Sequence, residues 1–237
     1  MRARRGLVTI DGPAGVGKST VGRQVAQHLN LAFVDTGLFY RGLTVLAGRS
    51  GLGTDRPDPL AKLARQLHIE INPDPAAAAG AWQVRVSGEE LGDELWDPSQ
   101  ATLLAYVASQ PEVRRALLQA QRRPARQGAV AVGRDTGTVV FPGATCKVYL
   151  EAPVAVRLQR RRGELARRGL DDSEAALEAD VIARDHTDSS RADAPLARAP
   201  DALAIDTSRL SAAEVVVTVL AACHRRGLRP RPAVLRG

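Results

Sequence analysis

Short apolar runs alternate with longer amphipathic segments along most of this chain of 237 residues. Leu7–Asp11 and Ala32–Asp35 are brief apolar runs of the kind that forms buried parallel strands. Three later runs, 130–132, 148–150 and 203–205, repeat this pattern. The segments with helical spacing are 21–29, 38–46, 154–168 and 212–225. Five strands alternating with helices predict an α/β fold, with a five-stranded parallel sheet and helices on both faces.

The alternation breaks between residues 56 and 98. A helix flanked by prolines is followed by two strand-like stretches, 68–72 and 82–88, which lie on either side of a spacer rich in alanine and proline. In the second stretch Trp82, Val84 and Val86 alternate with polar residues, as in a half-buried strand. We therefore expect 56–98 to be an inserted subdomain with a small antiparallel sheet, and 1–55 with 99–237 to form the core domain.

Composition narrows the class of protein. Hydrophobic residues make up 44% and charged residues 25% of the chain, which favours a globular protein over a disordered one, and aromatic residues at 3% imply an aliphatic core. No apolar run approaches the roughly 20 residues of a membrane-spanning helix. The first residues lead straight into a strand and not into a signal peptide, so we expect a cytoplasmic protein without a membrane partner.

The cysteines and the terminal arginines bear on further classes of site. Cys146 and Cys223 are isolated, without CxxC spacing, so we expect reduced apolar residues and neither a disulfide framework nor a zinc site. The net charge of +7 comes largely from arginines near both ends. Such tails can bind nucleic acid through its phosphates, but we favour the alternative that they are solvated ends, since few aromatic residues are available to stack on bases.

A glycine-rich loop follows the first predicted strand. Its sequence GPAGVGKST fits the pattern GxxxxGK[ST], between a strand and a helix. Backbone N–H groups of such a loop cradle phosphate oxygens at a helix N-terminus, the lysine reaches the β- and γ-phosphates, and the serine ligates Mg²⁺. The alternative is a glycine-rich turn with a surface lysine. The residues expected to bind ATP are Gly12, Pro13, Ala14, Gly15, Val16, Gly17, Lys18, Ser19 and Thr20, with Ser19 as the Mg²⁺ ligand.

Three arginine clusters indicate a second anion site. GTPases, motor ATPases and small-molecule kinases share the glycine loop, but the chain has neither an NKxD motif nor an apolar run ending in paired acids. A kinase must hold a second phosphate, for which guanidinium groups are suited. The clusters are DTGLFYR, which contains Arg41, GRDTGTVVFP, which contains Arg134 and Asp135, and ARDHTDSSRADAPL, which contains Arg184, Asp185, Asp188 and Arg191. Taken alone, Arg184 and Asp188 also fit an ordinary helix ion pair.

These motifs together resemble the bacterial cytidylate kinases. The stretches IDGPAGVGKST, VDTGLFYR, GRDTGTVVFP, RDHTDSSRADAPL and ADALAIDTS match that family in order and spacing over nearly the whole chain. The resemblance implies a P-loop kinase fold, in which the insert is the subdomain that binds the monophosphate and residues from about 157 to 170 form a lid over ATP. For Arg157, Arg160 and Arg161 of this lid, the alternative is a solvated basic helix face.

The resemblance also implies a CMP site and a reaction. The residues it assigns to CMP are Arg41, Arg134 and Arg191 for the phosphate with Thr36 nearby, Arg184 and Asp188 for the ribose, and Arg114 and Asp135 for the cytosine edge. The residues expected to carry the transfer are Lys18, Arg134, Arg191 and Asp188, while Arg157 and Arg161 would contact ATP. The expected reaction converts ATP and CMP or dCMP into ADP and CDP or dCDP, on a monomer that uses Mg²⁺ and binds no specific nucleic acid. The alternative is a nucleic-acid-binding P-loop ATPase.

The chain departs from the family at three positions. Ala101 and Ala105 stand where the family has serines, one of which contacts cytosine, so we expect a weaker or water-mediated contact to the base. Thr136 replaces the usual methionine of the GRDMG motif, a change to which the sequence alone assigns no chemical consequence.

Overall fold

A computed structural model describes residues 6–53, 57–73, 82–167, 174–191 and 194–230. The chain divides into two compact units, one made of Met1–Leu31 with Val130–Gly237 and the other of Ala32–Ala129. The predicted boundaries of the insert, 56–98, differ from this division and remain a prediction.

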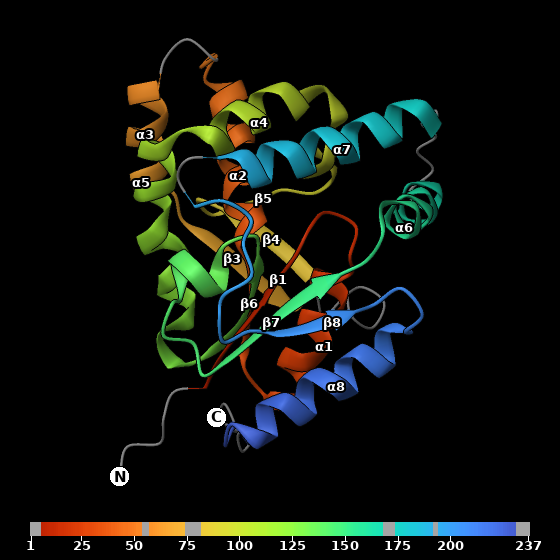
Figure 1. Ribbon diagram of the computed structural model, residues 1–237. Helices are drawn as coiled ribbons and strands as arrows, with labels where there is room; N and C mark the ends of the chain where they lie inside the picture. The colour runs from red at the N-terminus through yellow and green to blue at the C-terminus, as the bar shows by residue number, and fades with distance from the viewer. Residues whose placement is uncertain (1–5, 54–56, 74–81, 168–173, 192–193, 231–237) are drawn as a thin grey trace. The chain divides into compact units, whose positions relative to one another are not determined.

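The main sheet has five strands in the order β2-β6-β1-β7-β8, which confirms the predicted α/β fold (Figure 1). Register is parallel between β1 and β7, where Ile10 lies opposite Val148, and between β7 and β8. Four residues of β1 and all five of β6 are buried, as expected of strands covered on both faces. The bounds of the strands are β1 Leu7–Asp11, β2 Ala32–Asp35, β6 Ala129–Gly133, β7 Cys146–Glu151 and β8 Leu203–Asp206.

Among its described residues, the first unit has four α-helices. In this unit α1 packs against α8, and α6 packs against α7 (Figure 1). The helix α8 begins with a capping box, in which Ser211 accepts from the Glu214 amide and Glu214 accepts from the Ser211 amide. The helices are α1 Lys18–Leu29, α6 Val154–Arg167, α7 Glu174–Ser190 and α8 Ala212–Arg225, with one π-helical turn, η4 Thr136–Val140.

The second unit contains a small antiparallel sheet in the order β3-β4-β5. Its β3 and β4 pair with Ile71 opposite Val84, as predicted for the two stretches around the spacer. The helix α2 packs against α4, and α3 packs against α5. The bounds are α2 Thr36–Arg49, α3 Pro57–Gln66, β3 Ile69–Pro73, β4 Trp82–Val86, β5 Glu89–Glu90, η1 Asp93–Trp96, η2 Pro98–Gln100, α4 Ala101–Ser109, α5 Pro111–Arg122 and η3 Arg123–Gln127.

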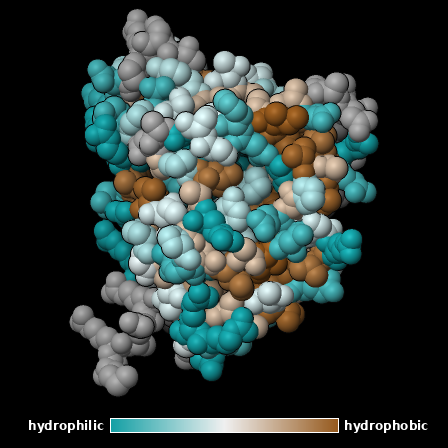
Figure 2. Space-filling view, viewed as in Figure 1, coloured by the Kyte–Doolittle hydropathy of each residue, from teal (hydrophilic) through white to brown (hydrophobic). Residues whose placement is uncertain are grey.

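The interior of both units is aliphatic, as the low aromatic content predicts. Among the described residues, Phe39 is the largest side chain that is fully buried. The next largest are mainly isoleucine, leucine and valine. Figure 2 shows hydrophilic residues spread over one face, with hydrophobic groups among them. Cys146 and Cys223 are free and buried. Over the ranges that the structure describes, no helix combines the length and the apolar character needed to cross a bilayer.

Candidate functional site

The glycine loop joins β1 to α1 in a backbone conformation that its glycines make possible. A Cβ atom added to Gly12, which has φ of 148°, would lie 2.2 Å from the Leu150 carbonyl oxygen. Gly17 has φ of 94° and caps α1, so the helix begins at Lys18, three residues before the predicted start at Val21. The loop therefore ends at the first turn of a helix, a position where backbone N–H groups and the helix dipole favour anions.

Lys18 lies over its own loop. Its side chain is buried, and Nζ donates a hydrogen bond to the Pro13 carbonyl at 2.6 Å. This contact opposes the alternative of a surface lysine, because the ammonium group is held at the loop. Ser19 follows in the first turn of α1.

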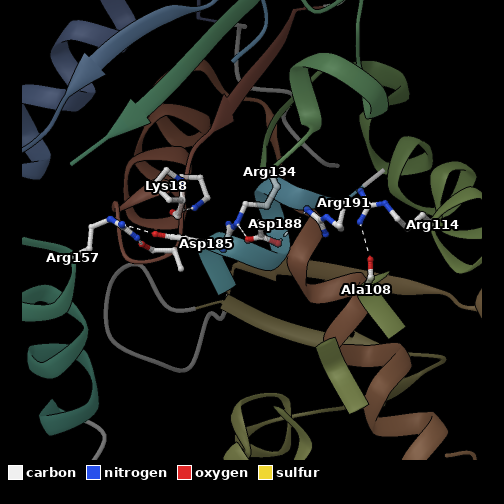
Figure 3. A network of polar contacts seen from close by, with 10 residues as sticks. Lys18, Ala108, Arg114, Arg134, Arg157, Asp185, Asp188 and Arg191 are labelled. Atoms are coloured by element: carbon white, nitrogen blue, oxygen red, sulfur yellow. Dashed lines mark hydrogen bonds and ion pairs between the residues drawn. The ribbon is translucent and has the colours of Figure 1, made fainter. Parts of the chain in front are cut away.

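Arg157 connects the glycine loop to α7. Its Nη1 donates to the Ala14 carbonyl at 3.2 Å and its Nη2 to Asp185 at 2.5 Å, while Nε donates to the Ala152 carbonyl at 3.1 Å (Figure 3). The residue is only 4% exposed, so the alternative of a solvated basic face is wrong for this arginine. Asp185 belongs to the third arginine cluster, and the sequence does not predict its contact with Arg157, 28 residues away.

The other two lid arginines differ from Arg157. Arg160 donates from Nη1 to the Thr207 hydroxyl at 2.9 Å and from Nη2 to the Thr207 carbonyl at 2.6 Å, beyond the end of β8. Arg161 is half-buried. Residues 168–170 of the expected lid lie outside the described residues.

Asp188 lies between two predicted phosphate-binding arginines. Its Oδ2 accepts from Arg134 Nε at 2.7 Å, and its Oδ1 lies 3.1 Å from Arg191 Nη2 (Figure 3). The side chains of Asp188 and Arg191 are 17% and 9% exposed. The first unit thus brings Arg134, which follows β6, together with the end of α7. The side chain of Arg184, the expected partner of Asp188 in a helix ion pair, is not among those described.

Asp11 stands at the carboxyl end of β1, directly before the loop. Its Oδ1 accepts from the Thr136 amide at 2.8 Å and from the Thr136 hydroxyl at 2.6 Å, and its Oδ2 accepts from the Gly137 amide at 2.7 Å. Burial raises the pKa of Asp11 from its usual value, and these hydrogen bonds act against that rise. Sequence reasoning missed this contact because 125 residues separate the partners. Asp135, the predicted base-reading residue, is also buried in the same turn.

Three predicted CMP ligands lie in the second unit. Arg41 donates from Nη1 to the Leu95 carbonyl at 2.7 Å, and its guanidinium lies 4.4 Å from the centre of the Trp96 ring. Arg114 is buried, donates from Nη1 to the Ala108 carbonyl at 3.1 Å, and lies 5.4 Å from the Tyr40 ring centre. Both guanidinium groups are therefore held by a backbone carbonyl and an aromatic face.

Thr36 is the third of these ligands in the second unit. It is buried and is the first residue of α2, which begins two residues before the predicted Leu38 because Asp35 caps it.

Sequence comparisons show which known proteins this chain is similar to. A family model described as cytidylate kinase matches residues 8–225. A bifunctional pantoate ligase/cytidylate kinase from Synechocystis sp. is 43% identical over 216 residues, which cover 90% of this chain and 42% of the relative. Cytidylate kinases from Rhodococcus jostii and Rhodococcus opacus are 40% and 39% identical over 222 residues, covering 93% of this chain and 95% of each relative. The chain spans about two fifths of the length of the bifunctional relatives it matches.

Proposed function

The chain belongs to the cytidylate kinase family, and from that premise we propose that it transfers the γ-phosphoryl group of ATP to CMP or dCMP. The products are ADP and CDP or dCDP. One observation carries the proposal: a single unit holds the glycine loop with Lys18 and also the group formed by Arg134, Asp188 and Arg191. The loop suits a triphosphate, and the arginines suit the phosphate of an acceptor.

The donor side rests on the loop and the residues around it. Backbone N–H groups at the start of α1 bind the phosphates of ATP, and Lys18 exchanges its bond to the Pro13 carbonyl for one to a phosphate oxygen. Arg157 holds the Ala14 carbonyl and so fixes the outer edge of the loop. Arg161 contributes positive charge from the same helix.

Magnesium fits this site. Mg²⁺ keeps several waters and binds through substrate phosphates with one or two protein oxygens, so the Ser19 hydroxyl in the first turn of α1 suffices. Among the residues described, no group of three His, Cys, Asp or Glu side chains is placed to hold a metal. When bound, the ion neutralises charge on the β- and γ-phosphates.

On the acceptor side, Asp188 sets the direction of two guanidinium groups. Arg134 gives its Nε and Arg191 its Nη2 to this carboxylate, and we propose that both guanidinium groups bind the CMP phosphate. For Thr36, Arg41, Arg114, Asp135 and Arg184 we propose the CMP roles that the family resemblance implies. For 56–98 and for about 157–170 we propose the roles of monophosphate-binding insert and lid.

The chemistry asks little of the protein beyond position and charge. A phosphate monoester is already a nucleophile, so no general base is required, and the transition state spreads negative charge over the transferred group. Lys18, Arg134 and Arg191 stabilise that charge. A well-placed arginine is worth about 10³–10⁵ in rate in related systems.

Product analysis with competing acceptors tests the function. The protein is incubated with Mg·ATP and CMP, dCMP, UMP, AMP or GMP, and the diphosphates are separated by ion-exchange chromatography. We expect CMP and dCMP to be turned over in preference to AMP and GMP, and we expect Lys18→Ala to abolish transfer. Equal turnover of all five acceptors, or none of CMP, would refute the proposal.

The nucleic-acid alternative gains no support from the structure. Residues 1–5 and 231–237, which contain most of the terminal arginines, lie outside the described residues. ATP hydrolysis stimulated by RNA or DNA, without turnover of CMP, is the result that would favour it.

A further inference from the structure

Thr136 makes a contact that the family's methionine cannot make. The residue is fully buried, and its hydroxyl donates to Asp11 Oδ1 at 2.6 Å. Its backbone N–H donates to the same oxygen at 2.8 Å. A methionine at this position would keep the backbone bond only, because a thioether has no proton to donate.

The Asp11 carboxylate is buried in a tightly packed place. The carboxylate is 4% exposed, and its second oxygen accepts from the Gly137 amide at 2.7 Å. Space next to it is tight, since a Cβ added to Gly137 would lie 3.1 Å from Asp11 Oδ2 and 2.9 Å from the Thr9 hydroxyl. A buried carboxylate has lost its water, and hydrogen bonds from the protein offset that cost. Each of the three donors to Asp11 therefore contributes to its stability.

The turn that Asp11 holds carries the acceptor-site residues. Arg134 and Asp135 directly precede Thr136, and Arg134 reaches Asp188. The turn closes on itself, because the Asp135 carbonyl accepts from the amides of Val139 and Val140 at 2.8 and 3.1 Å. Asp11 itself is followed directly by Gly12, the first residue of the glycine loop. One carboxylate thus links the start of the glycine loop to the turn that begins with Arg134.

We propose that Asp11 and the Thr136 hydroxyl form a buried positioning pair, which holds the Arg134–Asp135 turn in register with the glycine loop. The pair touches neither substrate. It acts through Arg134, so its loss weakens acceptor binding more than donor binding. This inference rests on the proposed function for its kinetic consequence, but the holding of the turn itself needs no nucleotide to be observed.

Matched variants at two positions test the pair. Thr136→Val keeps the shape and removes the hydroxyl, and Thr136→Ser keeps a hydroxyl at this position. Thr138→Val is the control, because it removes a hydroxyl of the same turn that makes a long hydrogen bond of 3.4 Å to the Asp135 carbonyl and none to Asp11. We expect Thr136→Val to raise KM for CMP about tenfold with KM for ATP changed less than about twofold, as befits loss of a hydrogen bond to a charged group. Thr136→Ser and Thr138→Val should stay near the parent protein.

Amide hydrogen exchange supplies a readout that does not depend on activity. Removing the hydroxyl should speed exchange at the amides of Thr136 and Gly137, and Thr136→Ser should restore slow exchange. If the parent protein fails to phosphorylate CMP, the proposed function is lost, while the exchange rates still decide whether the pair holds the turn. The inference would be overturned if Thr136→Val left amide exchange or the KM for CMP unchanged. It would also be overturned if the amides of Thr136→Ser exchanged as fast as those of Thr136→Val.

Discussion

A carboxylate held between two arginines is the residue-scale feature with the largest expected effect on acceptor binding. Asp188 contacts Arg134 and Arg191 while being only 17% exposed, so replacing the carboxylate by an amide removes the charge and sets an NH₂ group against one of the two guanidinium groups. We expect Asp188→Asn to raise KM for CMP at least tenfold in steady-state assays, with a smaller change in KM for ATP. Ser189→Ala, at the exposed neighbouring residue, is the control. Equal losses for both nucleotides would contradict the assignment.

Arg157 is expected to act on the donor side. Its three hydrogen bonds run to the Ala14 carbonyl, the Ala152 carbonyl and Asp185, a geometry that the point charge of a lysine does not reproduce. Arg157→Lys should therefore raise KM for ATP about tenfold and leave KM for CMP within about twofold, as loss of charge-assisted bonds worth about 1.5 kcal/mol would do. Measuring both constants separates this result from a general loss of folding.

The contacts of single residues mark the limit of what the sequence predicts. The glycine loop and the arginine motifs identify residues such as Lys18 and Arg134 by local spacing alone. The partners of Asp11 and Asp185 lie 125 and 28 residues away, so only the folded chain reveals them. Thr136 shows the same limit, since its replacement of methionine has no consequence until Asp11 is seen beside it.

At the scale of elements, a buried lysine joins β7 to the segment before β8. Lys147 Nζ donates to Asp201 Oδ1 at 2.9 Å, and this bond lowers the pKa of Asp201 below its usual 3.8. A carboxyl group whose pKa falls on folding contributes stability above its unfolded pKa and loses it as pH falls through the folded pKa. We expect Asp201→Asn to lower Tm at pH 7, and the difference from the parent protein to close as pH is lowered below 3.8.

Thermal unfolding followed by circular dichroism between pH 7 and pH 3, for the parent protein and the variant, checks this behaviour. Glu178→Gln, at an exposed carboxylate in the second turn of α7, serves as the matched control and should leave the curve unchanged. A Tm difference that is the same at every pH would show that the charge of Asp201 does not matter.

The positions of elements are predictable where hydrophobic patterning decides them. The five strands of the main sheet and the helix α8 match their predicted ranges because apolar side chains must be buried. Helix starts are missed where backbone geometry decides, as at Gly17 before α1 and Asp35 before α2. The strand β5, Glu89–Glu90, is formed by two exposed charged residues that pair with β4, a case that hydrophobic patterning does not reveal.

At the scale of the whole molecule, ligand binding should appear as stability. A ligand that binds only the folded chain adds about 2.7 kcal/mol at a concentration 100 times its Kd. We expect saturating Mg·ATP to raise Tm by several degrees in the parent protein and much less in Lys18→Ala. Differential scanning fluorimetry measures both, and an equal rise in the two proteins would mean that ATP binds away from the glycine loop.

Two glycines of the glycine loop are constrained for unrelated reasons. At position 12 any side chain meets the main chain of β7, at the Leu150 carbonyl, whereas at position 17 nothing lies within 4 Å and the obstacle is the left-handed φ. Asparagine, which enters that region at modest cost, is thus a conceivable substitute at position 17 but not at position 12. Motif letters that look equivalent in a pattern therefore record different constraints, steric crowding in one case and torsional preference in the other.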